Sequence, residues 1–181
     1  MIKNPINKAV FLDRDGVIVI PHFREGRSFA VRSMADFHLY PDAYESLVRL
    51  KENGFLLIVV TNQPDVGRGL ISSETLEKMN LFLFQNLPID DIRVCPHTKE
   101  EGCGCKKPKP GLLQSASKDF NIDCTASYMV GDRQSDVEVG RAVGCKTVFI
   151  DLGYTAETKP ENADFFSRNL KEAAHWIVKS S

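Results

Sequence analysis

Two aspartates flank an arginine in the tetrapeptide Asp-Arg-Asp-Gly at positions 13–16. Two carboxylates near one phosphoryl group can divide its chemistry: Asp13 can attack phosphorus, and Asp15 can handle the proton of the leaving group. Gly16 would let the backbone approach a substrate closely. The same tetrapeptide can also be an Asx turn that ends a strand, so on its own it leaves both interpretations open.

A second polar cluster, Thr61, Asn62 and Gln63, directly follows the apolar run at 55–60. A threonine hydroxyl and backbone N–H groups at this place can bind phosphate oxygens. Asn is also a common turn residue, and taken alone the segment fits a simple strand end better.

A segment rich in lysine and proline, Lys-Lys-Pro-Lys-Pro-Gly, spans residues 106–111. A run of charges commonly forms a solvated face. Prolines restrict the backbone, however, and can fix the point at which one lysine is aimed. Because a phosphate with developing charge needs such a cation, Lys106 and Lys107 are candidates for phosphate binding.

Another pair of acids occurs in Gly-Asp-Arg-Gln-Ser-Asp at positions 131–136. Asp136 could simply cap the helix that follows, with Arg133 beside it. If Asp132 and Asp136 face Asp13, the three carboxylates would instead bind a hard divalent cation. Mg²⁺ prefers a few carboxylates together with water and phosphate oxygens.

Three of the five cysteines fall within eleven residues, and a histidine lies among them. Three thiols and one imidazole match a tetrahedral Cys₃His zinc site, and the alternative is a set of free buried cysteines. Since all four ligands come from the protein, the site would be structural and would stabilise the loop that delivers the lysines. The predicted zinc ligands are Cys95, His97, Cys103 and Cys105.

Apolar runs alternate with amphipathic segments along most of the chain, a pattern that predicts an α/β fold with a doubly wound, Rossmann-like parallel sheet. Residues 17–38 show no sustained period and are predicted to be a long loop or small flap, and we expect one domain over residues 1–181 with an inserted zinc loop at 95–105. The expected strands are 9–12, 55–60, 91–94, 128–130 and 146–150. Three helices are expected to begin near Pro41, Ser72 and Pro110, a fourth to end before Gly144, and a fifth to include Leu170 to Ile177. In such sheets ligands bind where the strands end, which is where the polar clusters lie.

Composition narrows the class of protein. The 181 residues include 43% hydrophobic and 26% charged residues, and the net charge is −1. A strongly basic nucleic-acid binder is therefore disfavoured, and no apolar run approaches the about 20 residues that a membrane helix needs. No secretory signal is visible, so we expect a cytoplasmic protein that is monomeric and has no nucleic-acid or membrane partner.

These motifs together resemble those of the haloacid dehalogenase (HAD) phosphatases. The stretches at 13–17, 61–62, 107 and 131–136 are similar to the four family motifs, in the family's order. The zinc-loop pattern and Lys-Pro-Lys-Pro-Gly further resemble a small group that acts on heptose 1,7-bisphosphate or on histidinol phosphate. The lysine-proline pattern favours the heptose branch, which implies removal of the 7-phosphate in nucleotide-activated heptose biosynthesis.

The resemblance implies roles for individual residues. Asp13 would be the nucleophile and Asp15 the general acid and base, with Thr61 and Lys107 holding phosphate oxygens. Magnesium would be bound by Asp13, the backbone carbonyl of Asp15, and Asp132. Supporting roles are expected for Arg133 and Asp136, the latter orienting Lys107 or a metal-bound water.

No gap between the motifs leaves room for a large cap, so the flap and the zinc loop are expected to recognise the substrate. The segment after the first motif departs from the pattern of many heptose enzymes and leaves the substrate, or its anomer, open. The basic residues expected near a second phosphate are Arg24, Arg27, Lys106 and Lys109. Histidinol phosphate is cationic at one end and would be repelled by them. A zinc-stabilised binding protein without activity is the alternative from another class.

Overall fold

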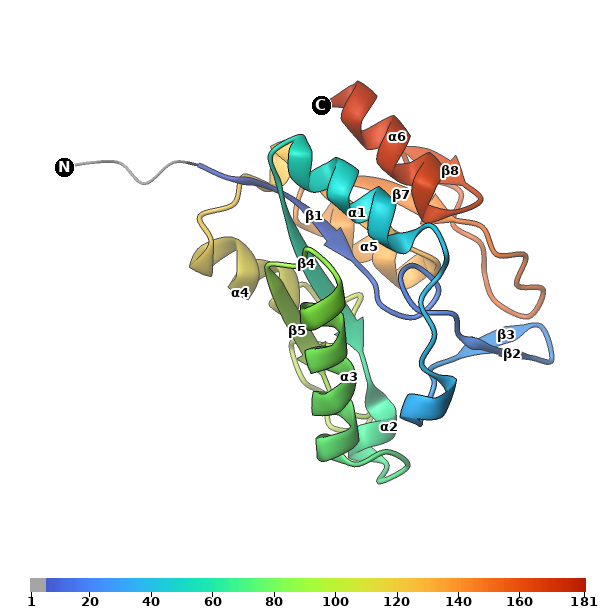
Figure 1. Ribbon diagram of the computed structural model, residues 1–181. Coiled ribbons are helices and arrows are strands. Elements are labelled where there is room, and N and C mark those ends of the chain that lie inside the picture. Colours follow the sequence, from blue (N-terminus) through green and yellow to red (C-terminus); the bar gives the residue numbers. More distant parts are fainter. Residues whose placement is uncertain (1–5) are drawn as a thin grey trace.

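The structure is a computed structural model in which residues 6–181 are described. Six strands form one sheet in the order β5-β4-β1-β6-β7-β8 (Figure 1). All neighbouring strands in it are parallel. The strands are β1 (Lys8–Leu12), β4 (Phe55–Asn62), β5 (Asp91–Cys95), β6 (Tyr128–Gly131), β7 (Lys146–Ile150) and β8 (Phe165–Ser167). The predicted α/β parallel sheet is confirmed.

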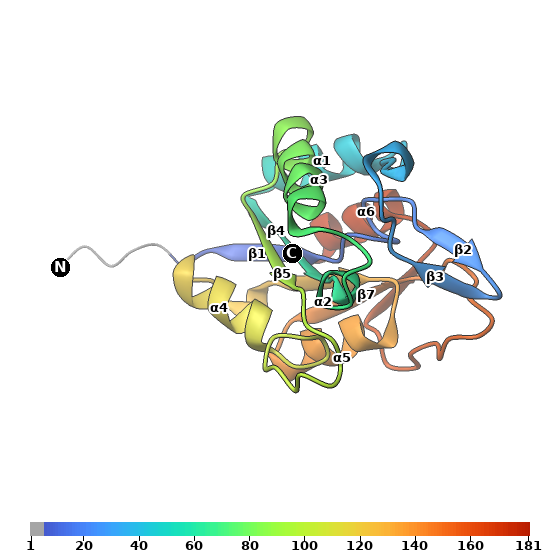
Figure 2. The same ribbon diagram turned by 90° about the horizontal axis from the view of Figure 1, so that it is seen from below.

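Helices cover both faces of the sheet (Figure 2). One face carries α1 (Ala43–Glu52), α3 (Ser73–Asn86) and α6 (Leu170–Ser180), and the other carries α4 (Gly111–Asp119) and α5 (Gln134–Ala142). Side chains of β1 alternate between the two layers: Val10 and Leu12 pack with the first group, and Ala9 and Phe11 with the second. Because both faces are covered, the strands are apolar without alternation.

Several short elements were not predicted. The segment 17–38, expected to be a loop or small flap, contains an antiparallel hairpin of β2 (His22–Arg24) and β3 (Arg27–Phe29) and a 3-10 turn at Met34–Asp36. The others are α2 (Pro64–Gly67), β8 and a 3-10 turn at Cys124–Ala126. Elements of three or four residues are too short to show a hydrophobic period.

Three expected helix positions shift by a residue or two. The helix expected from Pro41 begins at Ala43, and its N-cap residue is Asp42. Leu87 lies four residues after Leu83, a spacing that predicts a place in the same helix; it follows the end of α3, although its side chain is buried. Phe120, which helical spacing from Leu113 and Ala116 predicts on the inward face of the next helix, likewise follows the end of α4 and is only partly buried.

The hairpin β2–β3 lies beside the loop 151–164 in both views (Figures 1 and 2). The backbone N–H of Ala156 donates to the carbonyl of Gly26 at 3.1 Å. The rings of Phe23 and Tyr154 stack with their centroids 5.8 Å apart. The hairpin is therefore attached to the C-terminal part of the chain. No helix among the described residues is long and apolar enough to cross a membrane.

Candidate active site

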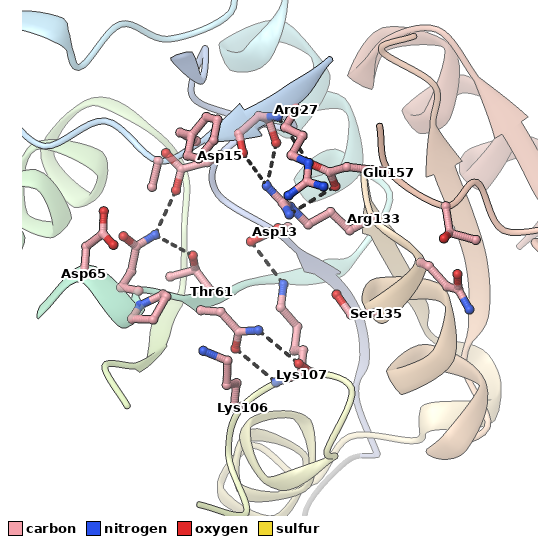
Figure 3. A pocket seen from close by; sticks show the side chains of 18 of the residues that line it. Asp13, Asp15, Arg27, Thr61, Asp65, Lys106, Lys107, Arg133, Ser135 and Glu157 are labelled. Carbon is pink, nitrogen blue, oxygen red and sulfur yellow. Dashed lines mark hydrogen bonds and ion pairs between the residues drawn. The ribbon is translucent and has the colours of Figure 1, made fainter. Parts of the chain in front are cut away.

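The polar clusters at the carboxyl ends of different strands meet at one edge of the sheet, where Thr61 and Asn62 are the last residues of β4. Their residues line a cavity of about 650 Å³ (Figure 3). Parallel strands end at the same edge, so the topology produces this convergence. The volume is within the range of small-molecule sites. Predicted site residues in the lining are Asp13, Asp15, Thr61, Asn62, Gln63, Lys106, Lys107 and Arg133.

Asp13 is held firmly at the end of the central strand β1. Its backbone N–H donates to the carbonyl of Val130 at 2.9 Å. Its Oδ1 accepts from the backbone N–H of Arg14 at 2.7 Å and lies 3.0 Å from Nζ of Lys107. The side chain is 10% exposed and faces the cavity, so its carboxylate can reach a ligand bound there.

Lys107 is buried between two carboxylates. Its Nζ lies 3.0 Å from Asp13 and 2.7 Å from Asp136. Burial alone lowers the pKa of Lys107, but these two carboxylates raise it above its ordinary value, so the ammonium stays charged. Asn62 holds the lysine backbone: its Oδ1 accepts from the N–H of Lys107 at 3.0 Å, and its Nδ2 donates to the carbonyl at 3.1 Å.

Asp15 is oriented by two side chains. Its Oδ2 accepts from Nε2 of Gln63 at 2.8 Å and from Nε of Arg14 at 2.9 Å. The same nitrogen of Gln63 also donates to Oγ1 of Thr61 at 2.9 Å. Both amide protons of Gln63 are thus used within the protein, so its Nε2 positions Asp15 and Thr61, while the residue also lines the cavity. Thr61 accepts here, and its own hydroxyl proton remains available to a phosphate oxygen.

Arg14 was not singled out by the sequence analysis, although it lies between the two acids. Its side chain is fully buried, pairs with Asp15 at 2.9 Å and lies over the ring of Phe37. A fully buried arginine requires such partners. An arginine between two candidate catalytic acids is the sequence signal that could have identified it.

Asp13, Asp132 and Asp136 form a buried acidic cluster in which one oxygen of each lies within 4.8 Å of the others. Burial raises the pKa of Asp132 well above its ordinary value, and the two neighbouring carboxylates raise it further. Burial also raises the pKa of Asp136 to about 6, despite the opposing effect of Lys107. Three carboxylates against one lysine leave an excess of negative charge that a divalent cation would neutralise. Oδ1 of Asp132 is buried and has no hydrogen-bond partner among the described residues, so a ligand atom is available.

Two glycines allow these carboxylates to pack against the backbone. A Cβ at Gly16 would lie 2.1 Å from Oδ2 of Asp132, and one at Gly131 would lie 2.2 Å from Oδ2 of Asp136. Gly16 also has a φ of +91°, which other residues rarely adopt. The group that approaches Gly16 closely is therefore Asp132, whereas the sequence analysis expected the substrate.

The predicted zinc ligands are brought together. Sγ of Cys95 lies 3.6 Å from both Sγ of Cys103 and Nδ1 of His97, and Cys105 Sγ lies 3.5 and 3.2 Å from those two groups. Tetrahedral coordination at 2.3 Å places sulfurs about 3.8 Å apart, whereas a disulfide joins them at about 2 Å. The cysteines are free, and their spacing fits a metal.

Besides Lys107, four basic side chains line the cavity, namely Arg27, Arg68, Lys106 and Arg133. Lys106 also donates from Nζ to the carbonyl of His97 at 3.1 Å, which ties it to the zinc loop. Arg24 and Lys109 were also expected near a second phosphate, and this expectation needs correction: neither is among the described residues that line the cavity. The guanidinium of Arg24 lies over the ring of Phe29, and Nζ of Lys109 donates to two carbonyls of the zinc loop.

Arg133 connects the site to the hairpin. Its Nη2 donates to the carbonyl and hydroxyl oxygens of Ser28 at 2.8 and 2.6 Å. Its Nη1 pairs with Glu157 at 3.1 Å. Arg133 therefore supports the wall of the cavity formed by the hairpin and residues 156–158, a contact between distant segments that local sequence patterns do not reveal.

Comparison with known proteins places this site in a family. A model described as HAD-hydrolase-like matches residues 104–173. The D-glycero-beta-D-manno-heptose-1,7-bisphosphate 7-phosphatase of Haemophilus ducreyi is 37% identical over 184 residues, an alignment that covers 94% of this chain and 98% of that protein. The chain belongs to the heptose-bisphosphate 7-phosphatase family of HAD hydrolases. It is a phosphatase, as the motifs predicted.

Other members of the heptose-bisphosphate 7-phosphatase family align just as completely. The Helicobacter pylori enzyme named for the beta anomer is 33% identical over 94% of this chain and 97% of its own length. The Burkholderia mallei enzyme named for the alpha anomer is 35% identical over 95% and 94%. A crystal structure of D,D-heptose 1,7-bisphosphate phosphatase from B. bronchiseptica, with magnesium and phosphate, matches 96% of this chain and 99% of that one, with a TM-score of 0.80 and 24% identity. That likeness shows the fold.

Proposed function

We propose that this phosphatase removes the 7-phosphate of D-glycero-D-manno-heptose 1,7-bisphosphate through an aspartyl phosphate on Asp13. The observation that carries the mechanism is the placement of Asp13 at the cavity, with the buried ammonium of Lys107 3.0 Å away. The substrate is supported by the names of relatives that align over nearly the whole chain. A cavity lined by Lys107 and four further basic side chains suits a substrate that carries two phosphates.

The first step transfers the phosphoryl group to the protein. A carboxylate oxygen of Asp13 attacks phosphorus, the bond from phosphorus to the sugar oxygen breaks, and Asp15 donates a proton to that oxygen. Thr61 and Lys107 bind the phosphoryl oxygens and stabilise the charge that develops on them. Arg14 and Gln63 keep Asp15 in place during this transfer.

The second step hydrolyses the aspartyl phosphate. Asp15 accepts a proton from water, the water oxygen bonds to phosphorus, and the bond to Asp13 breaks, which releases inorganic phosphate and restores both acids. Asp136 keeps Lys107 aligned through the 2.7 Å ion pair.

Magnesium fits the acidic cluster because of its excess negative charge and the free Oδ1 of Asp132. Asp13, Asp132 and the backbone carbonyl of Asp15 would hold it. When bound, Mg²⁺ reduces the repulsion between the nucleophile and the phosphate and neutralises charge in the transition state. Substantial turnover in excess EDTA would contradict this proposal.

The test of function is phosphate release with Mg²⁺ from both anomers of the heptose bisphosphate, fructose 1,6-bisphosphate and histidinol phosphate. We expect kcat/KM for one heptose anomer to exceed the values for the other substrates by about 10²-fold, a ratio that differences in pocket contacts commonly produce. A preference for histidinol phosphate would reject the substrate and retain the chemistry. If none of these esters is hydrolysed, both the proposed substrate and the proposed chemistry are rejected.

We also propose that Cys95, His97, Cys103 and Cys105 bind a structural zinc ion. Cys103→Ser should remove the zinc and loosen the loop that ends at Lys107, so that kcat falls by up to about 10²-fold through misplacement of the lysine. Zinc content, hydrogen exchange over 95–109 and kcat measure these effects. Cys124→Ser, outside the cluster, is the matched control. Unchanged zinc content and activity in Cys103→Ser would show that the site is not structural zinc.

A second phosphate should be recognised from the hairpin side of the cavity. Arg27→Gln should raise KM for the bisphosphate about 10-fold, the loss of one charge-assisted hydrogen bond, with little effect on KM for a heptose 7-monophosphate. Arg24→Gln provides a control on the same hairpin, because Arg24 lies outside the described lining. Equal effects of Arg27→Gln on both substrates would argue against a second phosphate at this place.

A further inference from the structure

Tyr154 approaches the acidic cluster from a distant part of the chain. It lies on the loop after β7, in a segment that the sequence motifs leave unassigned. Its hydroxyl donates to Oδ2 of Asp132 at 2.6 Å. Asp132 is 1% exposed, so this hydrogen bond is formed where water does not compete for the carboxylate.

This bond distinguishes the two oxygens of Asp132. Oδ2 is occupied by Tyr154, whereas Oδ1 is buried and has no hydrogen-bond partner among the residues described. A carboxylate held through one oxygen cannot turn freely about its Cβ–Cγ bond. The hydroxyl therefore fixes which oxygen of Asp132 is offered to a cation shared with Asp13.

The position of this hydroxyl depends on the hairpin. The ring of Tyr154 stacks on Phe23 of β2, with an angle of 20° between the ring planes. The neighbouring backbone is fixed by the hydrogen bond from Ala156 to Gly26. The hairpin that forms one wall of the substrate cavity thus also supports the group that holds Asp132.

We propose that Tyr154 is a positioning residue for the divalent cation at Asp132, and that Phe23 holds Tyr154 in place. This inference rests on the proposed magnesium site and adds a determinant of its affinity. The oriented partners of metal ligands commonly change affinity by about 10–100-fold when they are removed. The hairpin and the metal site are accordingly coupled through one stacked ring pair.

Tyr154→Phe tests the hydrogen bond and preserves the ring. Calorimetric titration with MgCl₂ alone should show a Kd raised about 10-fold or more relative to the wild type. The kcat measured at saturating Mg²⁺ should stay within about threefold of the wild-type value, and KM for substrate should not change, because Tyr154 positions Asp132 without touching the reacting atoms. Tyr44→Phe is the matched control, since Tyr44 is 58% exposed on α1.

Phe23→Leu tests the contribution of the stack and retains the tyrosine hydroxyl. Phe23→Leu should also raise the Kd for Mg²⁺, by a smaller factor than Tyr154→Phe does. Thermal melting establishes that each variant is folded. If the wild type binds Mg²⁺ and Tyr154→Phe binds it equally well, this inference is overturned while the proposed function stands. If Tyr154→Phe loses kcat at saturating Mg²⁺ while its Kd for Mg²⁺ is unchanged, the positioning role of Tyr154 is also overturned. If the wild type itself binds no Mg²⁺, the proposed metal site fails, and the inference with it.

Discussion

The Asp13→Asn variant should release no detectable phosphate and yet fold as well as the wild type. An amide is a poor nucleophile toward phosphorus, so the covalent step has no substitute in the site. Asn has nearly the same shape as Asp, and the hydrogen bond from the backbone N–H of Asp13 to the carbonyl of Val130 does not involve the side chain. Phosphate release over long incubations, with circular dichroism for folding, measures both parts.

Charge explains why stability should survive this substitution. Without metal, burial raises the pKa values of Asp132 and Asp136, and the charge of Asp13 raises them further, so ionising these carboxyls costs folding free energy. When folding raises the pKa of a carboxyl, the folded protein loses stability as the pH rises between the unfolded and the folded pKa. For Asp136 these pKa values are about 4 in the unfolded chain and about 6 in the folded protein. Asp13→Asn removes one repelling charge. The metal-free variant should therefore lose less stability than the wild type between pH 4 and pH 7, as followed by thermal melting.

A result against this account would be residual turnover above a few per cent, which would show that Asp13 is not the nucleophile. A variant that unfolds more readily than the wild type at pH 7 without metal would show that the ion pair with Lys107 outweighs the repulsion. Asp36→Asn, on the exposed 3-10 turn away from the cavity lining, serves as a control for the substitution itself.

Lys107→Met should be the most damaging substitution for stability in the site. The methionine has a similar length and no charge, so Asp13 and Asp136 would be left buried without their common cation. Breaking a buried ion pair from one side typically costs about 3–5 kcal/mol. Loss of a cation from the phosphoryl site should also reduce kcat by about 10²- to 10³-fold, the usual effect of removing one such donor.

Urea unfolding at pH 7, with and without Mg²⁺, measures the loss of stability in Lys107→Met, and steady-state kinetics with one substrate measures the fall in kcat. Lys109→Met is the matched control: it lies two residues away, and its ammonium is exposed and bonded to loop carbonyls. We expect it to change the free energy of unfolding by less than about 1 kcal/mol. A similarly small change in Lys107→Met would mean that the buried carboxylates are protonated and need no cation.

The sequence predicted those parts of the fold and site that depend on local patterns. The apolar run at 55–60 indicated a strand covered on both faces. The polar motif residues were expected at the strand ends, where the structure places Asp13 and Thr61. The Cys/His cluster was predicted from its spacing alone, because its four residues lie within eleven positions, and the structure brings them together. These features require few contacts between distant segments.

The remaining features depend on tertiary packing. Tyr154 reaches Asp132 across 22 positions, and Arg133 reaches Ser28 across 105, so no local pattern connects either pair. The positioning role of Gln63 was not foreseen either, because only the folded site shows that both protons of its amide are used by Thr61 and Asp15. Arg24 was assigned by its charge, and charge does not determine which way a hairpin side chain points.

The attachment of the hairpin to the loop at 154–157 has a consequence for changing the enzyme's specificity. Grafting the hairpin of a relative would be the obvious route to a new substrate preference, because Arg27, Ser28 and Phe29 line the cavity without belonging to the sheet. Under the proposed role of Tyr154, a graft that replaced Phe23 would also change the magnesium requirement, because Phe23 stacks on the tyrosine that holds Asp132. A chimera that seems inactive at ordinary magnesium concentrations should therefore be assayed at high magnesium before its specificity is judged.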